Sequence, residues 1–163
     1  MATGLGYPPE FPSDVHQTDT LGALTSGSFA RVEPTAIRDI GVFAGFDDEQ
    51  CQQVAGACQE LGVDAGTKLT EEGDFGYAMF AVLEGTADVS RNGEHIRTLG
   101  PGDVFGEIAV FFGGQRTATV TSTSPMRLVM LFNSELARLD REVPEVADEL
   151  RKVIGDRLAR DGR

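Results

Sequence analysis

The segment from Phe105 to Val120, FGEIAVFFGGQRTATV, places one acid and one base among mostly apolar and small residues. Glu107 and Arg116 are nine positions apart, and glycines lie shortly before each of them. A charge that is buried among apolar residues must be paired, bound to a metal or used to bind a charged ligand. A guanidinium offers a planar fork that suits two phosphate oxygens, whereas a carboxylate accepts hydrogen bonds from hydroxyl groups. The two side chains together therefore indicate a site for a nucleotide.

The backbone around Glu107 supports the same chemistry. Gly106 is followed by Glu107 to Val110, a stretch that predicts a single turn of helix between strands. The first N–H groups of a helix have no partner within it, and they favour anions. A structural alternative stays open, in which Glu107 and Arg116 form a buried ion pair and Gly113-Gly114 is only a turn. Such pairs are costly to desolvate, and a glycine-led anion nest is not expected beside them.

Composition limits the classes of partner. The chain has 163 residues, 40% of them hydrophobic, with 26 acidic and 14 basic residues and a formal net charge of -12. This charge repels phosphate backbones and anionic lipid surfaces, so we expect neither nucleic acid nor a membrane as a partner. No run approaches the roughly 18 apolar residues of a membrane helix, and the N-terminus lacks the pattern of a signal peptide. We therefore expect a cytoplasmic protein.

Enzyme chemistry finds little support in the sequence. The two histidines, His16 and His95, are too few for the histidine clusters of metal-dependent jelly-roll enzymes, and no G-x-S-x-G elbow or Walker loop is present. Cys51 and Cys58 lie two helical turns apart, too far for a disulfide, and we interpret them as small buried hydrophobes. We expect no catalytic residue, no metal and no cofactor.

The elements that must position Glu107 and Arg116 can be predicted from the hydrophobic pattern. Residues 1–34 contain Pro, Gly, Ser and Thr without a sustained period, and we interpret them as an extended or disordered arm that precedes a domain over 35–163. A helical pattern begins at Pro34, and a second helix is predicted to start at Asp47 and to stop at Gly62.

After Gly62 the period of the pattern falls from helical to two. Glycine turns separate the runs, and no crossover helix lies between them, which favours an antiparallel sandwich, jelly roll or barrel. Asn133 is predicted to cap a helix through Leu139, and Pro144 to open a last helix with one apolar stripe. The predicted strands are 68–70, 77–83, 87–90, 96–99, 117–121 and 127–132, and the stripe is Val146, Leu150, Val153, Ile154 and Leu158.

The sequence resembles the cyclic nucleotide-binding domain family from about Gly41 to Arg160. The family pattern F-G-E-[LI]-A-L is matched by Phe105–Val110, and its continuation R-[TSA]-A-[TSV] by Arg116–Thr119, after a short variable run. The resemblance implies a fold that is mainly β with flanking α. That fold is an antiparallel eight-stranded jelly roll with a short phosphate-binding helix, N-terminal helices and C-terminal helices.

The resemblance also implies roles for residues. Glu107 would accept a hydrogen bond from the ribose 2′-hydroxyl, and Arg116 would pair with the cyclic phosphate, helped by nearby backbone N–H groups. Thr117 leaves the base open between cAMP and cGMP, and we favour cAMP because most bacterial-looking members bind it. In the family a residue of the last helix closes over the base, which makes Arg157 and Leu158 candidate lid residues. The ligand-binding residues expected are Gly106, Glu107, Ile108, Ala109, Arg116, Thr117 and Ala118.

Two functions of different classes follow. In the first, the chain is a cyclic nucleotide receptor that moves its C-terminal helix to alter a contact with a protein partner or with a second copy of itself. In the second, the fold serves as a constitutive interaction or scaffold module, and its oligomeric state ignores nucleotides. The partner itself is not identified by the sequence.

Overall fold

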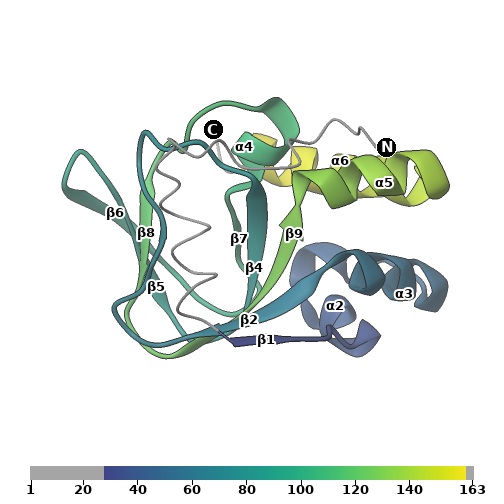
Figure 1. The fold of residues 1–163 in the computed structure, drawn as a ribbon, viewed down its shortest axis with the longest axis horizontal. Coiled ribbons are helices and arrows are strands. Elements are labelled where there is room, and N and C mark those ends of the chain that lie inside the picture. Colours follow the sequence, from purple (N-terminus) through teal and green to yellow (C-terminus); the bar gives the residue numbers. More distant parts are fainter. Residues whose placement is uncertain (1–27, 161–163) are drawn as a thin grey trace.

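Two antiparallel sheets face each other (Figure 1), and buried apolar side chains fill the space between them. The computed structural model describes residues 28–160. One sheet has the order β1-β2-β9-β4-β7 and the other the order β3-β8-β5-β6, which confirms the predicted mainly β, antiparallel architecture. The strands are β1 Ser28–Ala30, β2 Gln59–Val63, β3 Lys68–Thr70, β4 Ala78–Glu84, β5 Ala87–Arg91, β6 Glu94–Leu99, β7 Val104–Phe105, β8 Thr119–Ser122 and β9 Met126–Phe132.

Strand β4 is apolar on both faces because it separates two cores. Side chains alternate along a strand, so Phe80 and Val82 point between the sheets, whereas Met79 and Ala81 point toward the helices. The Phe80 and Phe105 rings stack in the interior with centroids 4.9 Å apart. Other residues of the inter-sheet core are Leu61, Leu69, Ala87, Leu99, Val120, Leu128 and Met130.

The helices gather beside the five-stranded sheet and cover its outer face (Figure 1). They are α2 Pro34–Asp39, the 3-10 turn η1 Gly41–Phe43, α3 Asp48–Ala57, α5 Asn133–Glu142 and α6 Pro144–Arg160, and a short helix α4 Glu107–Phe112 lies against β4. The predicted start of the last helix at Pro144 is confirmed. From its predicted stripe, Val146, Leu150 and Ile154 are buried in this second core, with Val153 packed at its edge.

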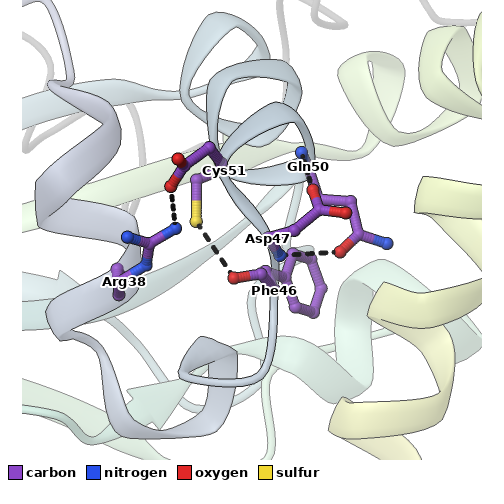
Figure 2. Close-up of polar contacts among 6 residues, drawn as sticks. Arg38, Phe46, Asp47, Gln50 and Cys51 are labelled. Atoms are coloured by element: carbon purple, nitrogen blue, oxygen red, sulfur yellow. Dashed lines mark hydrogen bonds and ion pairs between the residues drawn. The ribbon is translucent and has the colours of Figure 1, made fainter.

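Helix α3 begins where the acidic residues predict it. The Asp47 carboxylate accepts a hydrogen bond from the Gln50 N–H at 2.8 Å, and the Asp47 N–H donates to the Gln50 side chain at 2.9 Å, forming a capping box (Figure 2). Nearby, the Arg38 guanidinium of α2 pairs with Asp48, which ties the two helices together. The local sequence therefore specifies this helix start.

The end of α3 was predicted wrongly. The helix ends at Ala57 instead of reaching Gly62, because Cys58 adopts an extended conformation and Gln59–Val63 forms strand β2. β2 pairs with β9 over its whole length, so Leu61 enters the core between the sheets instead of an apolar helix face. Here long-range strand pairing outweighs the local helical spacing of apolar residues.

Three other helix boundaries differ from the prediction. Asn133 is the first residue of α5 and not its cap, which is Phe132, and the helix continues past Leu139 to Glu142. The Asn133 N–H donates to the carbonyl of Tyr77, the residue before β4, at 2.9 Å. The hydrogen bonding between β9 and the β4 segment therefore continues to the first residue of α5. Helix α4 extends two residues beyond Val110.

The predicted arm lies mostly outside the described residues, which begin at Ser28. Ser28–Ala30, at its end, forms β1 and pairs with β2 at the edge of the larger sheet. Pro34 is the first residue of α2. The division into an arm over 1–34 and a domain over 35–163 stays a prediction.

Both cysteines are free thiols, and the structure predicts that they react slowly. Cys51 is buried, and Cys58 lies half-buried where α3 ends. Burial of the thiol raises the pKa of Cys58 to about 12, and the negative charge of Glu135 is a second, smaller cause of the increase. At pH 8 a thiol with that pKa is only about one part in ten thousand thiolate, the reactive form. We expect Ellman's reagent to label the native protein much more slowly than the same protein in guanidinium; equal rates would contradict the burial of Cys51 and the raised pKa of Cys58.

Candidate anion-binding site

A cavity of about 310 Å³ opens at one end of the inter-sheet space. Its walls come from β3, β5, β6, β7 and β8 and from the segment 116–118. Three arginines line it, Arg91, Arg97 and Arg116, and no carboxylate is among the described residues of its walls. In a chain with a net charge of -12, this is a local concentration of positive charge that favours an anionic ligand.

The Arg116 side chain is held in place from two sides. It is 4% exposed; its Nη2 donates to the Ala78 carbonyl at 2.8 Å and its Nη1 to the Gly106 carbonyl at 3.2 Å. The guanidinium also lies 5.9 Å from the centre of the Phe80 ring. Two backbone carbonyls and an aromatic face thus orient the guanidinium at the cavity wall.

Gly106 is required for this arrangement. Its φ of +81° is a conformation that favours glycine, and it lets the chain turn from β7 into α4. A Cβ added at Gly106 would lie 2.7 Å from Arg116 Nη1 and 3.1 Å from the Ala78 carbonyl oxygen. The glycine therefore provides both the turn and the space for the guanidinium.

Glu107 is the first residue of α4 and is fully buried. α4 is held against the molecule by its apolar residues: Ile108, Val110 and Phe111 pack against the helix-side core. Phe111 thereby contributes to the core beneath the helix. This packing fixes the helix that carries Glu107.

The structure brings part of the predicted site together. Gly106, Arg116, Thr117 and Ala118 all line the cavity. Glu107 and Ile108 lie in the adjoining helix and are not among the described wall residues. Ala109 is not among them either, and its side chain lies outside the described part of the structure. The ligand-binding roles of all seven predicted residues stay predictions.

The candidate lid residues are in α6, at the end of the described chain. Arg157 and Leu158 belong to the helix Pro144–Arg160, but their side chains lie outside the described residues. Their role as a lid stays a prediction.

Two cavity arginines were missed by the sequence interpretation. Arg91 ends β5, and Arg97 lies in β6, where it pairs with Val89 across the hairpin. The pairing of β5 with β6 and β8 places both next to the segment 116–118. The available signal was the pair of basic residues on either side of the Asn92-Gly93 turn in an acid-rich chain.

A second cavity, of about 600 Å³, has the opposite charge. It lies between α2 and the ends of β2, β4 and β9, and four acids line it: Glu33, Asp39, Glu60 and Glu84. Its Arg127 already pairs with Glu60 and Glu84 at 2.8 and 2.6 Å. An anion is therefore expected in the smaller, arginine-lined cavity.

The comparison with known families decides what kind of domain this is. The family model described as the cyclic nucleotide-binding domain matches residues 61–142, which include the arginine-lined cavity. The chain belongs to the cyclic nucleotide-binding domain family. The expected resemblance is thereby confirmed, and the matched range includes the segment Phe105–Thr119.

Several relatives share this domain. The chain is 34% identical over 84 residues to a cAMP-dependent protein kinase regulatory subunit of Yarrowia lipolytica, covering 52% of this chain and 22% of that protein. It is 26% identical over 125 residues to a CRP-like cAMP-activated global transcriptional regulator of Mycobacterium tuberculosis, covering 74% and 56%. The chain thus spans only part of these curated relatives.

A solved structure has the same fold at comparable identity. The N-terminal domain of a transcriptional regulator from Streptomyces coelicolor A3(2) superposes with a TM-score of 0.68 at 30% identity, over 78% of this chain and 94% of that one. Residues 28–160 contain no group of three or more His, Cys, Asp or Glu residues arranged to hold a metal ion, and none of their helices has the length and apolar character needed to cross a membrane.

Proposed function

We propose that the chain is a cyclic nucleotide receptor and that its ligand is cAMP. The observation that carries the proposal is the cavity of a cyclic nucleotide-binding domain lined by three arginines, with Arg116 fixed at its wall. The names of two relatives, a cAMP-dependent kinase regulatory subunit and a cAMP-activated regulator, support this ligand. The domain acts by binding and not by catalysis.

The binding roles follow from the chemistry of each group. Arg116 binds the cyclic phosphate through its planar fork, and the first backbone N–H groups of α4 contribute at the same anion. Glu107 accepts a hydrogen bond from the 2′-hydroxyl, which is free in a 3′,5′-cyclic nucleotide. Thr117 is exposed at the cavity wall and offers a hydroxyl to the phosphate or to the base.

Binding becomes a signal through the C-terminal helix. The buried Val146, Leu150 and Ile154 pack α6 into the core shared with α2 and α3. Ligand contacts near the end of α6 would change this packing and so alter a contact with a protein partner or a second copy of the chain. The apolar contacts of α6 would have to rearrange when the helix moves. The packed and the rearranged positions of α6 are the two states that such a switch needs.

Isothermal titration of the purified protein with cAMP and cGMP tests the receptor. The protein is first washed under denaturing conditions and refolded, which removes any nucleotide that copurified. We expect a Kd of about 1 µM or tighter for cAMP, about 8 kcal/mol or more of binding free energy, and weaker binding of cGMP. Preference for cGMP would reassign the base, and absence of binding to both would contradict the receptor.

A second measurement separates the receptor from a constitutive scaffold. Saturating cAMP should raise the melting temperature by mass action and change the hydrogen exchange of α6. Light scattering with and without cAMP gives the oligomeric state. A fixed oligomer whose size and melting temperature ignore both nucleotides would support the scaffold module instead. The absence of nucleic acid among the partners stays a prediction.

A further inference from the structure

The backbone of Arg116 is anchored by a turn that does not belong to the cavity. The Arg116 N–H donates to the Asp74 carbonyl at 2.6 Å, and the Gly73 N–H donates to the Arg116 carbonyl at 3.0 Å. One residue earlier, Gln115 forms an isolated bridge with Phe75. The turn over residues 71–74 therefore sets where the chain that carries Arg116 runs.

Glu72 connects this turn to two other segments. Its N–H donates to the Thr119 hydroxyl at 3.0 Å, and its carboxylate accepts the Asn92 N–H at 2.9 Å. Asn92 lies at the tip of the β5–β6 hairpin, where its φ is +54°. A single half-buried residue thus joins the turn, the start of β8 and the hairpin tip.

The hairpin in turn contacts the cavity wall. Arg91, next to Asn92, donates from Nε to the Thr117 carbonyl at 2.9 Å. Arg91 and Thr117 line the cavity, whereas Glu72 and Thr119 are not among its described wall residues. These hydrogen bonds connect the turn over residues 71–74, the hairpin tip and the segment that carries Arg116, and Glu72 makes two of them.

We propose that Glu72 is a positioning residue for ligand binding, an inference that rests on the proposed function. It holds the hairpin and the segment 115–119 at a fixed spacing, so that Arg91, Arg116 and Thr117 face the ligand before it arrives. A site that is ordered in advance does not lose that conformational freedom on binding, and its affinity is higher. Glu72 raises affinity in this way without touching the ligand.

Three variants test the role of the Glu72 carboxylate. Glu72→Ala removes the acceptor for the Asn92 N–H, and Glu72→Gln keeps an oxygen there while removing the same charge. Glu71→Ala removes a neighbouring acid whose partner, Lys68 at 3.4 Å, is exposed. For each variant, titration gives the Kd for cAMP, and hydrogen exchange without ligand reports on the Gly73 and Arg116 amides.

The expected result has a definite sign. Loss of an acid near a cationic cavity would by itself tighten anion binding, so weaker binding cannot come from charge. We expect the Kd of Glu72→Ala to rise about fivefold relative to Glu71→Ala, as for the loss of one hydrogen bond. Its Gly73 and Arg116 amides should exchange faster by a similar factor. Glu72→Gln should stay within about twofold of the unaltered protein, and Thr119→Val, which removes the other acceptor, should resemble Glu72→Ala.

Each contrary result overturns the proposal. Equal affinities of Glu72→Ala and Glu71→Ala, or a Glu72→Gln as weak as Glu72→Ala, would exclude positioning through this hydrogen bond. Weaker binding with unchanged exchange would mean that Glu72 acts on the ligand directly. If the unaltered protein binds neither nucleotide, the proposed function fails and the effect on affinity fails with it, while the exchange rates still decide whether Glu72 orders the segment.

Discussion

Arg116→Ala is expected to weaken cAMP binding by about 100-fold or more. Arg116 lies at the cavity wall with 4% of its surface exposed, and a methyl group there offers neither charge nor donors. Two charge-assisted hydrogen bonds to a phosphate contribute about 3 kcal/mol, which corresponds to that factor. Isothermal titration measures the loss directly.

The matched control for this variant is Arg127→Ala. It removes the same charge from the larger, acid-lined cavity, where Arg127 pairs with Glu60 and Glu84. We expect its affinity for cAMP to change by less than about threefold, because an exposed charge is screened by solvent and salt. If Arg116→Ala itself stays within that range, Arg116 does not bind the phosphate.

Arg116→Ala should leave the fold intact. It takes one donor each from the Ala78 and Gly106 carbonyls, a cost of about 1 to 3 kcal/mol that a small domain can tolerate. Far-UV circular dichroism should be unchanged, and the melting temperature should fall by several degrees. A variant that is unfolded would say nothing of phosphate binding, so the melting curve is recorded with each titration.

Gly106→Ala is the second large effect expected. The new methyl group would lie 2.7 Å from Arg116 Nη1, so the guanidinium must move from its place between two carbonyls. The backbone oxygen of Ala78, at 3.1 Å, limits movement in the other direction. We expect the Kd for cAMP to rise about tenfold or more, together with a loss of about 1 to 2 kcal/mol of stability from the φ of +81°.

Gly114→Ala separates the effect of the positive φ from the effect of the added methyl group on Arg116. Gly114 also has a positive φ, +99°, in the loop between α4 and Arg116, but an added Cβ there meets nothing within 4 Å. It should lose similar stability and keep its affinity within about twofold. If both variants lose affinity equally, the backbone conformation matters and the space for Arg116 does not.

Local patterns in the sequence determined much of this protein. The capping box at Asp47 and the alternating strands separated by glycine turns depend on neighbours a few residues apart, and the structure has both. Gly106 and Arg116 to Ala118, which line the cavity, could also be predicted as residues of one site from their types and spacing and from the family resemblance. Interactions between neighbouring residues, and the residue types that a ligand would require, can both be read from the sequence.

The tertiary structure decided what depends on distant partners. Residues 59–63 form a strand because β9 pairs with them, although their apolar spacing continues a helix. Arg91 and Arg97 join the cavity only through the pairing of β5 with β6 and β8. Glu72 reaches Asn92, twenty residues away, because two turns meet beside the Arg116 segment. Such contacts are stabilised by the packing of whole strands, so no short stretch of sequence specifies them.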